Sequence, residues 1–210
     1  PAYGYDVRLL HEETAEEVPA NEKGVVAVVP PLPPGCMSTV WGQDERFVQT
    51  YFTSFRDKLI YTTFDWGIRD EDGYYFILGR TDDVINVAGH RLGTREIEEA
   101  VSAHDAIAEV AVVGVADQLK GQMPLAFAVV KDAARAATPE QEVMAKVDSL
   151  LGAIGRPKRV HFINQLPKTR SGKVLRRSIQ AIAEGRDPGD LTTLDDPIGI
   201  QMVKEAVEGK

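Results

Sequence analysis

The sequence contains a single cysteine among its 210 residues, Cys36, so no disulfide bond can form within the chain. Such scarcity is typical of proteins from reducing compartments. No apolar run approaches the roughly 18 residues that a membrane-spanning helix requires. We therefore expect a cytoplasmic globular protein that does not enter a membrane. Cys36 follows a Pro-Pro-Gly loop and has no neighbouring pattern of His and Asp, so we do not expect it to act as a nucleophile.

Basic residues are in the minority, with 24 Lys and Arg against 32 Asp and Glu. This balance argues against a nucleic acid partner, because proteins that bind long polyanions present a broad basic face. Residues 156–177 are the exception, since they include eight Lys and Arg and no Asp or Glu. A basic island of this kind predicts a local anionic ligand, and a solvated basic helix face is the alternative.

The most informative segment of this island is Leu166–Lys173, with the sequence LPKTRSGK. Val160–Ile163 is predicted to be a strand before it. Apolar residues at helical spacing between Val174 and Ile182 predict a helix after it, and Gly185 is placed to end that helix. The segment is therefore a loop supported on both sides.

Three residues at the end of this loop suit an anionic ligand. Ser171 is placed to cap the following helix, and Gly172 relaxes the backbone. The free N–H groups of a first helical turn favour a nearby anion. We expect a phosphate at this corner and interpret Lys173 as a movable cation.

The N-terminal residues 1–81 read as strands between turns. The expected strands are Tyr5–Leu10, Gly24–Val29, Lys58–Thr62 and Tyr74–Leu78. This pattern predicts an antiparallel, barrel-like β lobe.

From residue 82 onward, the pattern alternates between helices and strands. The expected elements are a hairpin strand at Val84–Val87, a helix from Thr94 to His104, and strands at Val110–Val115 and Leu125–Val130. A further helix is expected to begin with Thr138 and Pro139, to close a capping box at Gln141, and to bury Val143, Met144, Val147, Leu150 and Leu151. The predicted fold class is α+β, a β lobe followed by a small α/β domain with helices on a short mixed sheet.

A second glycine-rich segment, Gly79–Glu98, has the sequence GRTDDVINVAGHRLGTREIE. Together with Leu166–Lys173, it resembles the short-chain acyl-CoA synthetases of the adenylate-forming superfamily. The run Gly-His-Arg-Leu-Gly-Thr is typical of the acetate and propionate ligases in this family. Phe64–Arg69, Lys120–Gln122 and Glu184–Leu194 are most similar to the propionate-CoA ligase branch. The resemblance covers essentially the whole chain.

The resemblance implies that the chain is the C-terminal part of a larger enzyme. Family members carry a large N-terminal domain with a phosphate loop and an acyl pocket, which this sequence lacks, and the chain begins at Pro1. Residues 1–81 would be the β-rich end of that domain, and residues 82–210 the mobile C-terminal domain. Asp82 would be the hinge, since a short polar residue at an element end can absorb backbone rotation. A simple polar turn is the alternative.

The resemblance also assigns nucleotide-binding roles. Asp65 would accept hydrogen bonds from the ribose hydroxyls of ATP, and Arg80 would donate to the same sugar. Arg91 would contact the adenylate phosphate, because a guanidinium group matches phosphate oxygens. Lys173 would be the catalytic cation. A turn-forming carboxylate is the alternative for Asp65, and an exposed salt bridge to Glu96 or Glu98 is the alternative for Arg91.

This sequence departs from acetate-type relatives at two places. Phe64 and Trp66 flank Asp65 where those relatives have glycines, which leaves the geometry of that loop open. Leu151 stands where some of them place an arginine for CoA. Arg156 or Lys158 would be the substitutes.

Small residues would form the CoA passage. Ala88 and Gly89 would let the pantetheine arm approach the backbone closely, although a tight turn has the same sequence. Family members also bind a cation through backbone carbonyls at the positions of Ser102, His104 and Ile107. A cation at the end of a helix is the alternative for His104.

The implied reaction joins a short-chain carboxylate to CoA. It consumes ATP with Mg²⁺ and passes through an acyl-adenylate. Acetate-CoA ligase, another short-chain synthetase, and a non-catalytic module that binds CoA or nucleotides are the alternatives. Family members are acetylated at the position of Lys173, so a lysine acetyltransferase and a deacetylase are the implied protein partners. We expect the isolated chain to be inactive in adenylation.

Overall fold

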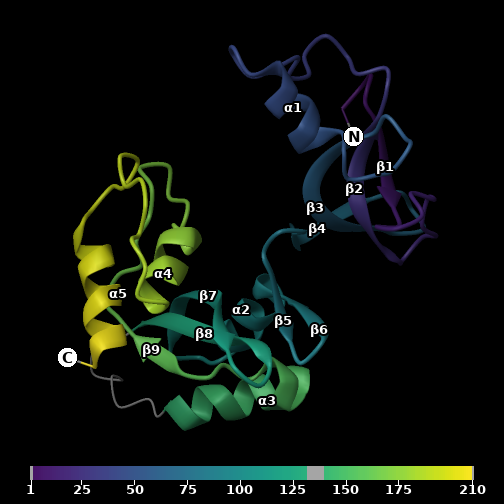
Figure 1. Cartoon of the computed structure of the whole chain (residues 1–210). Helices are drawn as coiled ribbons and strands as arrows, with labels where there is room; N and C mark the ends of the chain where they lie inside the picture. The colour runs from purple at the N-terminus through teal and green to yellow at the C-terminus, as the bar shows by residue number, and fades with distance from the viewer. Residues whose placement is uncertain (1, 132–139, 210) are drawn as a thin grey trace. The chain divides into compact units, whose positions relative to one another are not determined.

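A computed structural model describes residues 2–131 and 140–209. The chain divides into two compact units, Pro1–Asp83 and Val84–Lys210 (Figure 1). In the described part of the chain, no helix is both long enough and apolar enough to span a membrane.

The first unit is built on an antiparallel sheet with the strand order β1-β2-β3-β4. Its elements are β1 (Asp6–Leu10), β2 (Lys23–Val29), α1 (Asp44–Tyr51), β3 (Tyr61–Arg69) and β4 (Tyr75–Arg80). Side chains alternate along β2. Val25 and Ala27 pack with Phe55 on one face, and Val26 packs with Leu9 on the other. The predicted barrel-like lobe is thus an open sheet with β1 and β4 at its edges.

Strand β3 differs from the predicted strand at Lys58–Thr62, because it begins at Tyr61 and continues to Arg69. Asp65 and Gly67 have low strand propensity, but pairing with β2 and β4 carries the strand through them. A bulge interrupts the pairing with β4 between Trp66 and Gly67. Asp65 lies opposite Arg80 in this register.

The second unit contains a mixed sheet with helices on both faces. Its elements are β5 (Val84–Val87), β6 (His90–Gly93), α2 (Thr94–Ser102), β7 (Ile107–Asp117), β8 (Gly121–Val130), α3 (Glu140–Gly155), β9 (Val160–Phe162), α4 (Arg176–Ala183) and α5 (Ile198–Glu208). The strand order is β6-β5-β8-β7, and β9 pairs in parallel with β8. The predicted α/β arrangement on a mixed sheet is confirmed.

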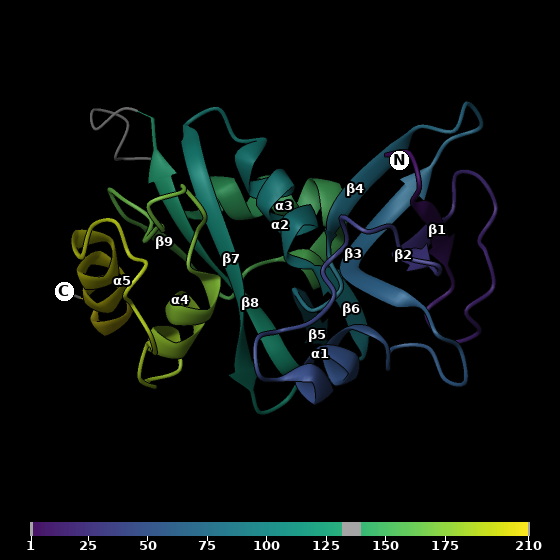
Figure 2. The same ribbon diagram turned by 90° about the horizontal axis from the view of Figure 1, so that it is seen from above.

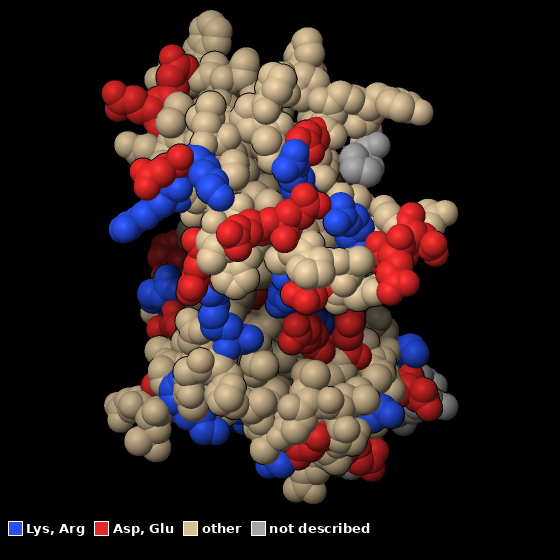
Figure 3. Space-filling model, turned by 90° about the vertical axis from the view of Figure 1, so that its right-hand side faces the viewer, with Lys and Arg blue, Asp and Glu red and all other residues tan. Residues whose placement is uncertain are grey.

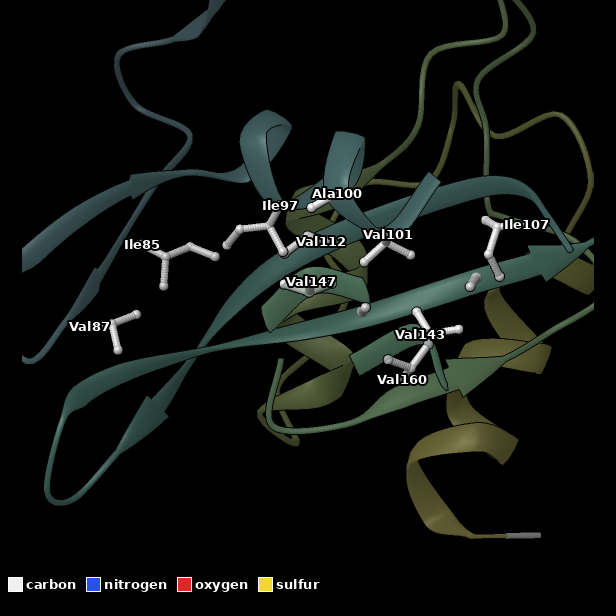
Figure 4. Packing of buried hydrophobic residues seen from close by; sticks show 12 residues of the cluster. Ile85, Val87, Ile97, Ala100, Val101, Ile107, Val112, Val143, Val147 and Val160 are labelled. Carbon is white, nitrogen blue, oxygen red and sulfur yellow. The ribbon is translucent and has the colours of Figure 1, made fainter. Parts of the chain in front are cut away.

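Alternation along β7 and β8 creates two cores on opposite faces of this sheet. Val112 and Ala126 face the core formed with α2 and α3, where Ile97 and Val147 are fully buried (Figure 4). The next residue on β8, Phe127, belongs to the core formed with α4 and α5. The order of these helices around the sheet can be followed in Figure 2. The second core supports the segment that leads to Lys173.

Several details of the sequence prediction need correction. Ser171 does not cap a helix, because α4 begins only at Arg176. Leu150, expected to be buried, is 54% exposed, and the helical backbone of α3 breaks nearby at Gly152. Thr138 and Pro139 lie outside the described residues. Gly185 does follow α4, with a φ of 69°.

Candidate functional site

Arg80 is the centre of a polar cluster in the first unit. Its Nη1 donates a hydrogen bond of 3.1 Å to the carbonyl oxygen of Thr63 and lies 3.8 Å from Oδ1 of Asp65. Its Nε and Nη2 donate to the two carboxylate oxygens of Asp82 at 2.9 and 3.3 Å. The hydrogen bonds to Asp82 raise the pKa of Arg80 above its ordinary value. Strand pairing and this guanidinium thus bring together Asp65, Arg80 and Asp82.

Phe64 shapes the backbone beside this cluster. It has a φ of 61°, a left-handed conformation that is uncommon for a side chain of this size. Its carbonyl accepts the N–H of Thr81 at 2.8 Å, and its ring lies 5.5 Å from the Arg80 guanidinium carbon. Phe64 and Thr81 also line a cavity of about 250 Å³. The other lining residues are Glu12, Val25, Ser54, Phe55 and Thr62. Sequence reasoning missed this cavity, because its walls come from segments far apart in the chain.

Ala88 and Gly89 form the turn of the β5–β6 hairpin. Their φ values of 50° and 87°, together with the pairing of Val87 with His90, describe a two-residue hairpin turn. The N–H of Ala88 donates to the carbonyl of Lys120 at 2.8 Å. Both residues are exposed, and a Cβ atom at Gly89 would meet nothing within 4 Å. The turn therefore presents open backbone to any ligand.

Arg91 follows this turn on β6 and is exposed. It pairs with Asn86 in the hairpin register. Glu98, one of the salt-bridge partners considered for Arg91, instead binds Arg176. Arg91 and the Ala88–Gly89 turn thus belong to the same β5–β6 hairpin.

Lys173 lies in a tight hairpin closed by pairing of Lys168 with Val174. The N–H of Gly172 donates to the carbonyl of Thr169, and the N–H of Thr169 donates to the carbonyl of Lys173, both at 2.8 Å. The hydroxyl of Thr169 also accepts the N–H of Lys173 at 3.1 Å. The predicted loop is therefore a hairpin with an ordered β-turn and a bulge, in which Gly172 has a φ of 83°. Lys173 is exposed at this hairpin.

The two hairpins belong to different parts of the second unit. The Ala88–Gly89 turn joins β5 to β6, and β6 is at one end of the strand order. Helix α4, which follows the Lys173 hairpin, packs on β7 at the other end. Figures 1 and 2 both show β6 and α4 on opposite sides of the β7–β8 pair.

The remaining predicted ligands have ordinary structural contacts. The carbonyl of His104 accepts the N–H of Ile107 at 3.0 Å, and its Nε2 lies 3.6 Å from Glu142. Ser102 is the last residue of α2. Within residues 2–131 and 140–209, no three His, Cys, Asp or Glu side chains lie together in a group that could hold a metal ion.

Charged side chains of both signs are interspersed on the face shown in Figure 3. Several basic residues of the 156–177 stretch form ion pairs with acids from elsewhere in the chain. Arg156 binds Asp148, and Lys168 binds Glu109 at 2.7 Å. The basic island is thus partly neutralised around the Lys173 hairpin.

Comparisons with known proteins agree with this geometry. Residues 96–173 match the AMP-binding enzyme C-terminal domain. The chain is 60% identical to propionate-CoA ligase of Escherichia coli strain K12, over 99% of this chain and 34% of that enzyme. It is 42% identical to acetyl-coenzyme A synthetase of Pyrobaculum arsenaticum, over 99% of this chain and 31% of that enzyme. The chain thus spans about a third of the length of these relatives.

Solved structures give the same result. The chain resembles ATP-bound MatB from Rhodopseudomonas palustris with a TM-score of 0.72 and 30% identity, over 85% of this chain and 35% of that one. It also resembles the amide bond synthetase McbA from Marinactinospora thermotolerans with a TM-score of 0.71 and 28% identity, over 85% and 34%. In its sequence and its fold, the chain is similar to the C-terminal part of adenylate-forming acyl-CoA synthetases.

Proposed function

We propose that this chain is part of an AMP-forming propionate-CoA ligase. The 60% identity to propionate-CoA ligase of Escherichia coli over nearly the whole chain carries this proposal. In the first step, a carboxylate oxygen of propionate attacks the α-phosphorus of ATP, and the bond to pyrophosphate breaks. In the second step, the thiolate of CoA attacks the acyl carbon, and AMP leaves with the electrons of the broken acyl–phosphate bond.

Asp65 and Arg80 would hold the ribose of the nucleotide in this reaction. Asp65 provides carboxylate acceptors, and Arg80 provides donors next to it on the paired strand. Arg80 is bound to Asp82, the proposed hinge, so rotation at Asp82 would alter the contacts of the ribose-binding guanidinium. A hard cation such as Mg²⁺ would accompany the phosphates of ATP, as is usual for nucleotides.

Lys173 would act only in the first step. Its ammonium group would neutralise the carboxylate and α-phosphate oxygens as they approach, which is charge stabilisation rather than proton transfer. Rotation of residues 82–210 would then replace the Lys173 hairpin at the active site by the Ala88–Gly89 turn. The open backbone of that turn would admit the pantetheine arm of CoA, and Arg91 would contact the adenylate phosphate.

The decisive experiment measures the two steps separately in the full-length enzyme. We expect Lys173→Ala to lower propionate-dependent ATP–pyrophosphate exchange by about 10²–10³, the usual cost of losing one charged donor to a developing anion. Thioester formation from supplied propionyl-adenylate and CoA should change far less. Arg170→Ala removes an exposed cation from the same hairpin and is the matched control. Near-normal exchange by Lys173→Ala would contradict the assignment.

The acyl substrate and the activity of the chain alone are tested in the same assay. Propionate should be preferred over acetate by the full-length enzyme, and a preference for acetate would favour an acetate-CoA ligase. The 210-residue chain should give no exchange above its own Lys173→Ala variant. If it binds CoA or adenine nucleotides with no full-length activity to match, the binding-module alternative is correct.

We further propose that Lys173 is the target of a cytoplasmic acetyltransferase and a deacetylase. Acetylation removes the positive charge, so it should abolish exchange much as Lys173→Ala does. The exposed position of Lys173 in its hairpin would admit a modifying enzyme. Mass spectrometry of native protein, followed by deacetylation and a second exchange assay, tests both the modification and its reversal.

A further inference from the structure

The Lys173 hairpin is held by a segment that follows it by about twenty residues. The N–H of Arg170 donates to the carbonyl of Thr193 at 3.2 Å, and the N–H of Asp195 donates to the carbonyl of Lys168 at 2.9 Å. Thr169 and Leu194 form an isolated antiparallel bridge between these two bonds. Residues 193–195 thus add a short third strand to the hairpin, and the two segments run side by side in Figure 1.

Helix α5 fixes the chain just before the hairpin. A Cβ atom at Gly199, in the first turn of α5, would lie 2.8 Å from both N and Cα of Pro167 and 3.1 Å from the carbonyl carbon of Leu166. These are backbone atoms, which cannot rotate away as the end of a long side chain can. Leu166 is 1% exposed and packs in the same core as Ile200 of α5. Only glycine allows this approach of α5 to the root of the hairpin.

Neither contact touches the side chain of Lys173. Together they set where the hairpin stands on the second unit, because Pro167 directly precedes Lys168 at the base of the hairpin. The rate of a positioned reaction is sensitive to displacements of about 1 Å, which can cost about 10²-fold. A shift of the hairpin root should therefore be felt at the ammonium group.

We propose that Gly199 and the 193–195 strand are positioning elements for the adenylation step, and that they act through Lys173. This inference rests on the proposed role of Lys173 in adenylation. In the full-length enzyme, Gly199→Ala must displace α5 or the Leu166–Pro167 backbone. The displacement should lower ATP–pyrophosphate exchange at least about tenfold. Thioester formation from supplied propionyl-adenylate should stay within about twofold, because the hairpin is then away from the reacting atoms.

A second pair of variants perturbs the other contact. Asp195→Pro removes the N–H that donates to Lys168, whereas Asp195→Ala keeps it. Because residue 195 is exposed, neither change alters a packed core. We expect Asp195→Pro to reduce exchange selectively and Asp195→Ala to leave it unchanged. Lys204→Ala, on the exposed surface of α5, is the control for the helix.

A double variant separates positioning from general stability. In the Lys173→Ala background, Gly199→Ala should cause little further loss of exchange, since the group that it positions is absent. If the losses of exchange from Gly199→Ala and Lys173→Ala multiply in the double variant, the inference is overturned and Gly199 has a structural role. Equal losses in the two half-reactions of Gly199→Ala would give the same conclusion. Wild-type exchange in both Gly199→Ala and Asp195→Pro would also overturn it. If Lys173→Ala itself keeps normal exchange, the proposed role of Lys173 fails instead.

Discussion

Arg176 and Glu98 form a bidentate ion pair across 78 residues of sequence. The Nη2 atom of Arg176 lies 2.9 Å from Oε1 and 2.8 Å from Oε2 of Glu98, and its Nε donates to Oε1 at 3.0 Å. Oε1 also accepts the N–H of Val112 at 2.9 Å. The pair joins α4 to α2 and β7. It therefore links the helix after the Lys173 hairpin to the helix after the β5–β6 hairpin.

Removing this guanidinium should destabilise the second unit. Glu98 is only 12% exposed, so Arg176→Ala leaves a largely buried carboxylate with one remaining donor. We expect a loss of about 2 kcal/mol in the free energy of unfolding, measured by urea denaturation. Arg95→Ala breaks the exposed pair with Glu99 on the same helix and should cost about 0.5 kcal/mol or less. Equal effects of the two variants would show that the Arg176 pair is no more than a surface contact.

Asp82 is both the proposed hinge and the ion-pair partner of Arg80, and two substitutions distinguish these roles. Asp82→Pro fixes φ at residue 82 and also removes the carboxylate that holds Arg80. Asp82→Asn removes the charge but leaves the backbone free. If Asp82 is the hinge, Asp82→Pro should impair thioester formation more than adenylation in the full-length enzyme, whereas Asp82→Asn should affect the two steps similarly. The two half-reactions are measured as for Lys173. Equal losses in Asp82→Pro would indicate misfolding instead.

Local patterns in the sequence predicted most strands and the end of α4, because alternation and glycine placement are properties of neighbouring residues. The predicted start of α4 near Val174 is wrong. Lys168 pairs with Val174, so the hairpin extends into residues that fit a helical pattern. Helix α5 was not predicted. Its buried residues, such as Val203, pack against elements distant in sequence.

The candidate site shows the same limit. The family motifs pointed to Lys173, Arg80 and Asp65, and their roles remain predictions. The 193–195 strand and the Glu98–Arg176 pair depend on tertiary contacts, so neighbouring residues gave no signal for them. The close approach of Gly199 to Pro167 is also invisible in a sequence, since a glycine inside a helix looks only unfavourable.

His161 should make stability depend on pH. Burial lowers the pKa of His161 below its ordinary value, and Arg159 adds to this, whereas Glu140 opposes it. The ring stacks on Phe127 with centroids 5.1 Å apart. Because the unfolded chain then binds a proton more readily than the folded one, the free energy of unfolding should fall as the pH drops below about 6.5.

The control for this prediction is a non-titrating ring. His161→Phe should retain the stacking on Phe127 and flatten the pH dependence of the unfolding free energy between about pH 7 and 5. A slope that persists unchanged in His161→Phe would assign the effect to other groups.

If the chain binds CoA as proposed, Leu151 would leave the phosphates of CoA without the arginine expected at this position, and the structure distinguishes the two candidate substitutes. Arg156 donates to the carboxylate of Asp148 through Nε and Nη2. The Nζ atom of Lys158 lies 3.9 Å from Asp117, and its side chain is 56% exposed. Asp117 pairs with Gly121, and the preceding residue, Lys120, binds the Ala88–Gly89 turn through its carbonyl. Lys158 is therefore the better placed cation for a ligand at that turn.

We predict that Lys158→Ala raises the KM for CoA about tenfold in the full-length enzyme, the loss expected for one charge-assisted contact to phosphate. ATP–pyrophosphate exchange should be unchanged, because that step precedes CoA. Arg156→Ala, which removes a cation that is hydrogen-bonded to Asp148 through two nitrogens, should change the KM for CoA by less than about twofold. Dephospho-CoA identifies the phosphate concerned: if Lys158 contacts the 3′-phosphate, wild type and Lys158→Ala should bind this analogue equally. A larger effect of Arg156→Ala than of Lys158→Ala would reverse the assignment, since it would show that Arg156 leaves Asp148 to hold the coenzyme.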